Sequence, residues 1–257
     1  MKVLEYARYI AKKVDDFMLE TIKGTPEVLY QASLHYIKAG GKRLRPLLTI
    51  LASRIAGGEE DIAIPGAAAI EVLHTFTLIH DDIIDKDELR RGVPTVHKIW
   101  GTDLAIVAGD LLFSYAYKCI LRALERNIPH ERVLKAVEYL TEGAITVAEG
   151  QALDMIFSST YNVDLKDYMN MIEKKTASLF IAAVSIGAVL AGGDKDLIMK
   201  LREVMKFAGI AFQIRDDVLG LLGDEKILGK PVYSDLREGK KTILVIYTLT
   251  KVNEEQK

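Results

Sequence analysis

Apolar residues recur at intervals of three and four along most of the chain, which is the pattern of amphipathic helices. Alternating β-branched runs are few and Asn-Gly turns are absent, so strands and hairpins are not indicated. We therefore predict an all-α fold of about eight to ten helices. Their expected spans are 2–22, 26–39, 46–57, 66–86, 102–126, 130–157, 164–174, 175–191, 195–222 and 234–251.

No low-complexity linker divides these helices, so we expect one domain over residues 1–257. With 49% hydrophobic residues, the chain can bury a large core. Residues 1–22 are amphipathic and lack the apolar centre of a signal peptide. The most apolar run, 179–191, is shorter than the roughly 18 residues that cross a bilayer, so we expect no membrane-spanning segment.

Net charge and cysteine content indicate which partners and which cellular compartment to expect. A formal net charge of −2 creates no general attraction for nucleic acid, so we expect no nucleic-acid partner. The single cysteine, Cys119, lies in an apolar segment and cannot form an intramolecular disulfide. We predict that it is a small buried side chain and that the protein is cytoplasmic.

Two aspartate pairs interrupt apolar helical segments: Asp81-Asp82, followed by Asp85, in HDDIID, and Asp216-Asp217 in IRDDVLG. Residues four apart share a helix face, so Asp81 and Asp85 should point the same way, with Asp82 about 100° around the axis. Carboxylates are seldom buried without a balancing positive charge, and groups of oxygen ligands suit Mg²⁺. A solvated helix end could explain one motif alone. Two motifs together predict a magnesium-bound phosphate between them, across a cavity.

Basic residues gather in three places that could balance diphosphate charge. Arginine grips phosphate oxygens through paired N–H donors, whereas lysine supplies a point charge. A surface charge run would explain any one group, but their coincidence with two acidic motifs favours diphosphate binding. The groups are GGKRLRP at 40–46, Arg90 with Arg91, and Lys230 with Lys240 and Lys241.

Taken in order, these segments resemble the trans-isoprenyl diphosphate synthases, or polyprenyl synthetases, and most closely the archaeal geranylgeranyl diphosphate synthases. The resemblance covers nearly all of residues 35–245. It implies an isoprenoid synthase-type helical bundle around a central cavity, normally a homodimer. The motifs are GGKRLRP, EVLHTFTLIHDDIIDKDELRRGVPTVH, GDLL, EGQALD, KKTASLF, GIAFQIRDDVLG and LGKPVYSDLREGKKT.

The activity implied by this resemblance is magnesium-dependent prenyl transfer. An allylic diphosphate (dimethylallyl, geranyl or farnesyl) ionises, the double bond of isopentenyl diphosphate attacks the cation, and a proton leaves. An apolar cavity shields the cation from water. We expect the C20 product geranylgeranyl diphosphate; a farnesyl or longer-chain synthase is the alternative.

The same resemblance assigns roles to individual residues. Three Mg²⁺ ions would be held, two by Asp81 and Asp85 and one by Asp216, with Asp82 and Asp217 in support; these aspartates and Lys175 are the expected catalytic residues. His74, Thr176 and Gln213 could instead be hydrogen-bonded interior residues. Isopentenyl diphosphate would bind to Lys42, Arg45, His74 and Arg91, with Arg43 close by, and the allylic diphosphate to Arg90, Lys175, Thr176, Gln213, Lys230 and Lys240.

Product length should depend on a bulky side chain that stops the growing apolar tail. Phe76 precedes Asp81 by five residues, or about 7.5 Å along a helix, and by the resemblance an aromatic residue there forms the cavity floor. The smaller Thr77 follows it. A helical wheel places Thr77 nearer the Asp81 line, and an ordinary core phenylalanine remains the alternative.

Two features depart from the family pattern. Gly220 occupies a position where many members carry a third aspartate, and the chain ends at Lys257, where the usual C-terminal helices would follow; we expect them to be missing. A class I terpene cyclase is a rival, although GGKRLRP and RRG argue for a second diphosphate pocket. A non-catalytic or partner-dependent synthase subunit is another.

Overall fold

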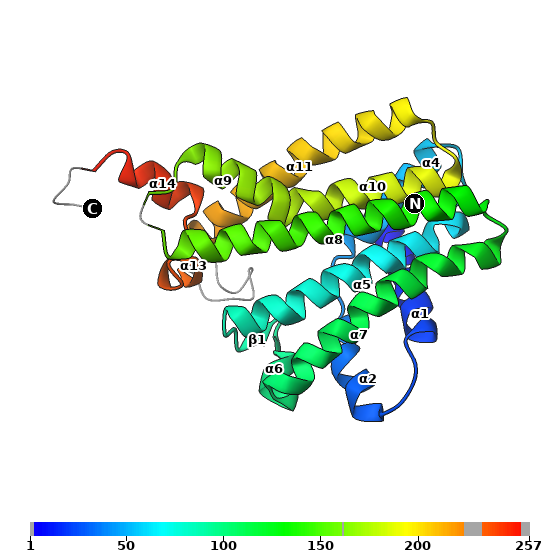
Figure 1. Ribbon diagram of the computed structural model, residues 1–257, viewed down its shortest axis with the longest axis horizontal. Helices are drawn as coiled ribbons and strands as arrows, with labels where there is room; N and C mark the ends of the chain where they lie inside the picture. Colours follow the sequence, from blue (N-terminus) through cyan, green and yellow to red (C-terminus); the bar gives the residue numbers. More distant parts are fainter. Residues whose placement is uncertain (1–2, 161, 224–232, 253–257) are drawn as a thin grey trace. The chain divides into compact units, whose positions relative to one another are not determined.

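The computed structural model describes residues 3–160, 162–223 and 233–252, and these are helical almost throughout (Figure 1). The predicted all-α fold is confirmed. Two compact units are distinguished: a first unit, Met1–Ala144 with Leu179–Glu203, and a second unit, Ile145–Ser178 with Val204–Lys257. Each is described by itself.

The first unit is built around α5 (Glu60–Ile84), which packs against α1, α4 and α7. Every residue of α5 from Ala63 to Leu73 is buried, and all of them except Glu71 are small or apolar. Gly187 lets its helix approach α4 closely, since a Cβ there would stand 1.9 Å from the carbonyl oxygen of Thr49. The other elements are α1 (Val3–Thr21), α2 (Glu27–Ser33), α3 (His35–Ala39), α4 (Leu44–Ile55), β1 (Leu89–Arg90), β2 (Val93–Pro94), α6 (Val96–Trp100), α7 (Thr102–Leu121), η1 (Arg122–Arg126), the start of α8 (His130–Ser158), α10 (Ser178–Ala191) and the start of α11 (Lys195–Leu222).

The second unit contains the later parts of α8 and α11. Between them the chain forms a π-helical turn, η2 (Glu173–Ala177). Glycines make room for this turn: a Cβ at Gly150 would stand 2.2 Å from the backbone nitrogen of Lys175, and one at Gly209 would stand 2.6 Å from Ala177. The remaining elements are α9 (Leu165–Ile172), α13 (Ser234–Arg237) and α14 (Ile243–Leu249).

Several predicted boundaries were wrong for local reasons. The helix expected from residue 66 begins at Glu60, with Pro65 in its second turn. The helix expected over 26–39 is divided at Leu34. The one over 234–251 is divided where Gly239 takes φ 73°, and Thr242 caps the helix that follows. The described residues alone contain more than ten helices, so the expected number was too low.

A short hairpin was not foreseen at all. Strands β1 and β2 pair antiparallel, and the turn between them consists of Arg91 and Gly92 with φ 55° and 79°. Two-residue strands are too short for alternation to be seen in sequence. The hairpin matters because it carries Arg90 and Arg91 back toward α5.

Among the described residues, three helical stretches are long and apolar enough to cross a membrane: Glu60–Ile84, Thr102–Arg126 and Leu165–Ala191. The third is longer than the apolar run seen in sequence, because α9, η2 and α10 continue without a break. Residues in the apolar windows of the first and third are 72% and 78% buried inside the fold. Core packing therefore accounts for most of their apolar character.

Candidate active site

The first aspartate motif lies at the C-terminal end of α5. The N–H of Asp85 donates to the carbonyl oxygen of Asp81 at 2.8 Å, so the two residues are one helical turn apart. Both are partly exposed, whereas Asp82 between them is fully buried. Two carboxylates of the motif are thus accessible and one points into the protein.

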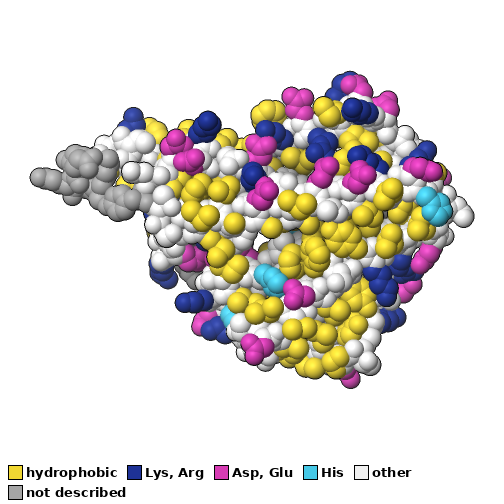
Figure 2. Space-filling view, viewed as in Figure 1, with side chains coloured by type: hydrophobic (Ala, Val, Ile, Leu, Met, Phe, Trp, Pro, Cys, Tyr) yellow, Lys and Arg dark blue, Asp and Glu magenta, His cyan; other side chains and the backbone are white. Residues whose placement is uncertain are grey.

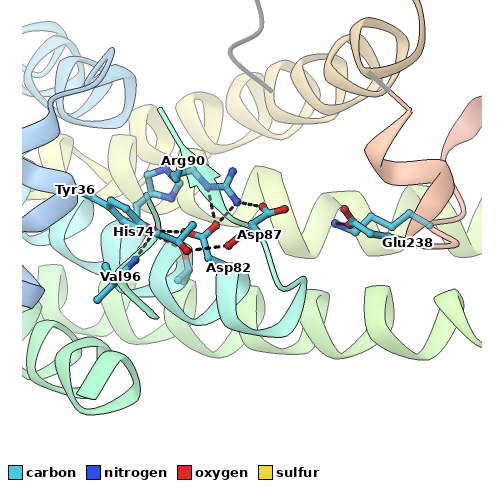
Figure 3. A network of polar contacts seen from close by, with 10 residues as sticks. Tyr36, His74, Asp82, Asp87, Arg90, Val96 and Glu238 are labelled. Carbon is cyan, nitrogen blue, oxygen red and sulfur yellow. Dashed lines mark hydrogen bonds and ion pairs between the residues drawn. The ribbon is translucent and has the colours of Figure 1, made fainter. Parts of the chain in front are cut away.

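A polar network holds the buried carboxylate of Asp82 (Figure 3). The hydroxyl of Tyr36 donates to its Oδ2, and Arg90 donates from Nε to its Oδ1 at 2.7 Å. Arg90 also donates to Asp87 at 2.8 Å. Burial raises the pKa of Asp82, and the positive charge of Arg90 opposes that rise. The guanidinium predicted to bind the allylic diphosphate is therefore already paired with two carboxylates.

Arg43 is buried and fully engaged by the protein. Its Nε donates to Asp15 at 2.7 Å, its Nη1 to Glu71 at 2.9 Å and its Nη2 to the carbonyl oxygen of Ile37 at 2.7 Å. These contacts favour a structural role over direct contact with a diphosphate. The expected role of Arg43 near isopentenyl diphosphate stays a prediction.

Arg45 differs from Arg43 because one of its donors is not satisfied within the described part of the chain, and His74 lies within its positive field. Among the described residues, the buried Nε of Arg45 has no hydrogen-bond partner, and its guanidinium lies over the ring of Phe180 at 4.6 Å. Burial lowers the pKa of Arg45 to about 10. Burial, together with Arg45 and Arg91, lowers the pKa of His74 well below its usual value. Positive charge is concentrated around a neutral imidazole, and an anion would balance it.

The glycine-containing loop before α4 packs closely on two of these guanidinium groups. A Cβ at Gly41 would stand 2.7 Å from Nη1 of Arg91 and 3.0 Å from Nη1 of Arg43. Arg91 also donates to the carbonyl oxygen of Gly40. We call Arg43, Arg45 and Arg91 with His74 the arginine cluster. Lys42, in the same loop, is exposed.

The second aspartate motif, on α11, repeats the division between an exposed and a buried carboxylate. Asp216 is exposed and Asp217 is buried. The hydroxyl of Tyr168 donates to Oδ2 of Asp217 at 2.7 Å, and Nε2 of Gln213 donates to its Oδ1 at 2.8 Å. Burial raises the pKa of Asp217, and these hydrogen bonds oppose the rise.

The π-helical turn η2 connects residues predicted from two motifs, KKTASLF and GIAFQIRDDVLG. Thr176 donates to Oε1 of Gln213 at 2.6 Å, and Gln213 donates in turn to Asp217. Lys175, in the same turn, donates to Asp154 of α8 at 2.5 Å. Single π-helical turns are frequent at functional sites. The structure therefore joins Thr176 to Gln213 and Asp217 of the second motif, and Lys175 directly precedes Thr176 in the turn.

Asp235 lies beside the position where a third aspartate of the second motif was expected. A Cβ at Gly220 would stand 3.0 Å from Oδ2 of Asp235, and both residues line a pocket of about 270 Å³ with Asp217. Sequence reasoning missed Asp235, although PVYSDLREGK carries it just before Lys240. Lys240 pairs with Glu238 at 2.8 Å, and Lys230 lies outside the described residues.

Other residues of these networks were also missed, among them Glu71, Tyr36 and Tyr168. Glu71 was detectable, because it is a lone carboxylate in the long apolar run of α5 and such residues are rarely buried without a partner. The sequence around Tyr36 and Tyr168 does not indicate that they contact the aspartate motifs. They are 46 and 49 residues away from the aspartates they contact, and tyrosine is common in helical cores.

Phe76 packs toward α7. Its ring makes edge-to-face contacts with His80, at a centroid distance of 4.8 Å, and with Phe113 of α7, at 5.3 Å. Thr77 instead donates its hydroxyl to the carbonyl oxygen of His74 on the same helix, at 2.8 Å. Phe76 is thus the bulkier of the two and part of an aromatic group; their role as a chain-length floor stays a prediction.

The carboxylates fit magnesium that is shared with a ligand. Within the described ranges, no three side chains of His, Cys, Asp or Glu form a complete metal-binding group. Mg²⁺ does not require one, since it keeps several waters and often binds one or two carboxylates together with substrate phosphates. Asp81 with Asp85, and the exposed Asp216, supply partial sets of hard oxygen ligands of this kind.

Comparison with known proteins adds to this geometry. Residues 26–257 match the polyprenyl synthetase family. The chain is 52% identical to a geranylfarnesyl diphosphate synthase of Aeropyrum pernix, over 95% of this chain and 77% of that protein. It is 49% identical to a geranylgeranyl diphosphate synthase of Sulfolobus acidocaldarius, over 98% and 76%. A crystal structure of geranylgeranyl pyrophosphate synthetase from Pyrococcus horikoshii superimposes with a TM-score of 0.91 at 44% identity, covering 98% of this chain and 76% of that one.

Proposed function

Since the chain belongs to the polyprenyl synthetase family and is a prenyltransferase, we propose that it condenses isopentenyl diphosphate with an allylic diphosphate to give geranylgeranyl diphosphate. The observation that carries this proposal is the arginine cluster, in which the buried Nε of Arg45 lacks a partner among the described residues. A protein whose site contained only metal-binding carboxylates would bind a single diphosphate group, through its metal ions. A separate cationic site supports two diphosphate substrates.

Isopentenyl diphosphate is assigned to the arginine cluster. Arg45 and Arg91 supply positive charge, and neutral His74 can donate one hydrogen bond. Arg43 fixes the loop before α4 through its ion pairs with Asp15 and Glu71 and is not assigned a direct contact with the diphosphate. The exposed Lys42 adds a cation at the entrance to this loop.

The allylic diphosphate is assigned to the two aspartate motifs. Asp81, Asp85 and Asp216 would hold up to three Mg²⁺ ions, which when bound neutralise charge on the departing pyrophosphate. Lys175 adds a positive charge, and Thr176 and Gln213 order the second motif. Arg90, Lys230 and Lys240 complete the predicted set, with Arg90 acting through Asp82.

The reaction then follows from charge separation. The allylic C–O bond breaks, the double bond of isopentenyl diphosphate forms the new C–C bond, and a proton is lost to the departing pyrophosphate. The protein supplies orientation and exclusion of water, both of which favour a short-lived carbocation. No side chain is required to form a covalent intermediate.

Product length is proposed to be C20. One relative is a C20 synthase and another a geranylfarnesyl, or C25, synthase, so similarity leaves both open. Phe76 favours the shorter product, because its ring is braced by Phe113 and cannot swing aside without disturbing that contact. The C25 product is the second candidate, on the strength of the 52% identity to the Aeropyrum pernix enzyme.

We further propose that the enzyme is a cytoplasmic homodimer. Helix α7 exposes large apolar side chains: Ile106, Val107, Phe113 and Leu121. Figure 2 shows hydrophobic side chains gathered on this part of the surface. Contiguous exposed apolar surface is typical of protein interfaces, and a second copy of the chain could cover it.

The test is direct product analysis. The purified chain is incubated with Mg²⁺, labelled isopentenyl diphosphate and each allylic primer in turn, and the dephosphorylated alcohols are separated by length. A dominant C20 alcohol supports the proposal, and a C25 alcohol would replace it with the second candidate. Asp216→Asn is the control that should abolish product. No product from folded wild-type protein would refute the synthase activity.

A further inference from the structure

Both aspartate motifs show the same arrangement in different units. The first aspartate of each pair, Asp81 or Asp216, is accessible, and the second is buried. In each case a tyrosine from another helix donates its hydroxyl to the buried carboxylate. Tyr36 of α3 bonds to Asp82, and Tyr168 of α9 bonds to Asp217 at 2.7 Å.

The two tyrosines are themselves fixed in place. Both are buried, at 0% and 1% exposure, and the hydroxyl of Tyr36 also accepts the N–H of Val96 at 3.3 Å. Burial and the adjacent carboxylates raise the pKa of each phenol. Each phenol therefore keeps its proton and acts as a hydrogen-bond donor at any physiological pH.

The remaining oxygen of each buried carboxylate is also occupied. Oδ1 of Asp82 accepts from Arg90, and Oδ1 of Asp217 accepts from Gln213. A carboxylate held at both oxygens is poorly placed to bind a metal directly. It instead fixes the helix turn that carries its accessible neighbour.

We propose that Tyr36 and Tyr168 are positioning residues for the magnesium–diphosphate site. Each anchors the second aspartate of a pair, and this orients the first aspartate toward metal. This inference rests on the proposed function, and it assigns to two tyrosines a task that the motif sequences do not contain. Groups that orient metal ligands from behind typically change metal affinity about 10–100-fold when removed.

The experiment uses Tyr36→Phe and Tyr168→Phe in the full chain. Tyr115→Phe is the matched control, because Tyr115 is also buried and also donates its hydroxyl, to the carbonyl oxygen of Lys23 at 3.0 Å, with a longer contact to the hydroxyl of Tyr30 at 3.4 Å. Thermal unfolding is followed while Mg²⁺ is titrated at fixed inorganic pyrophosphate. This measures metal-dependent binding without turnover. Prenyl transfer is then assayed across the same Mg²⁺ range.

We expect the Mg²⁺ concentration for half-maximal stabilisation to rise about 10–100-fold in both Phe variants, with Tyr115→Phe matching the wild type. Wild-type Mg²⁺ midpoints in the two variants would overturn the proposal, as would a wild-type chain that Mg²⁺ and pyrophosphate do not stabilise. If one variant fails to fold, the other decides, because Tyr36 and Tyr168 belong to different compact units. A stabilised but inactive wild-type chain would refute the synthase and still test the tyrosines.

Discussion

At the scale of single residues, Phe76 is the side chain on which product length should depend. Its ring contacts Phe113, so Phe76→Ala removes both the bulky side chain and its contact with the ring of Phe113. We expect products longer than C20 from this variant, because the apolar tail gains space. Thin-layer separation of the labelled alcohols measures the change.

Phe207→Ala is the control for this prediction. Phe207 is an exposed phenylalanine on α11, and its truncation should leave product length unchanged. An unaltered C20 product from Phe76→Ala would remove Phe76 from the floor and leave Phe113 or Thr77 to be examined.

His74 gives a prediction about pH. Its pKa in the folded protein lies well below the usual value, because of burial and then of Arg45 and Arg91. Below about pH 6.5 the unfolded chain gains a proton on His74 that the folded chain does not, so stability falls with falling pH by at most about 1.4 kcal/mol per pH unit. Urea unfolding of wild type and His74→Gln between pH 7.5 and 5.5 measures this. The variant should lose less stability on acidification, and parallel curves would contradict the prediction.

At the scale of elements, a buried ion pair joins the loop before α4 to α5. Arg43 and Glu71 are 2.9 Å apart and both side chains are almost fully buried. Among the described residues, Glu71→Gln leaves the guanidinium with only the partly exposed Asp15 as a charged partner, and we expect a loss of about 3 kcal/mol of unfolding free energy.

Denaturant unfolding of Glu71→Gln and Glu138→Gln tests this prediction. Glu138 pairs with Lys135 on the surface of α8 at 2.5 Å, and loss of an exposed pair typically costs under about 1 kcal/mol. Equal effects of the two substitutions would show that burial adds nothing to the Arg43 pair.

At the scale of the whole molecule, the exposed apolar face of α7 predicts self-association. Val107→Asp places a charge among apolar side chains that a second copy would cover, and burying an unpaired charge is costly. We expect a dimer for the wild type and a monomer for the variant, by sedimentation velocity. Ile55→Asp, on an exposed apolar residue at the end of α4, is the control and should remain dimeric. A monomeric wild-type chain would contradict the proposal.

The amino-acid sequence alone determined the helical class, the long helices and the acidic and basic motifs. Helical periodicity is a local property, so the spans predicted over 102–126, 130–157 and 195–222 agree with α7 with η1, α8 and α11 within one residue at each end. The motifs also identify Thr176, Gln213 and Asp217, which form one series of hydrogen bonds in the structure.

Tertiary structure decided how these residues differ from one another. In sequence, Asp81 and Asp82 are carboxylates of one motif, and Arg43 and Arg45 are guanidinium groups of one loop. Folding buries Asp82 against Tyr36 and Arg43 against Glu71, while Asp81 stays accessible and Arg45 keeps an unsatisfied donor. Burial and hydrogen bonding depend on residues far away in the chain, and for that reason the local pattern did not show which member of each pair is buried or what it contacts.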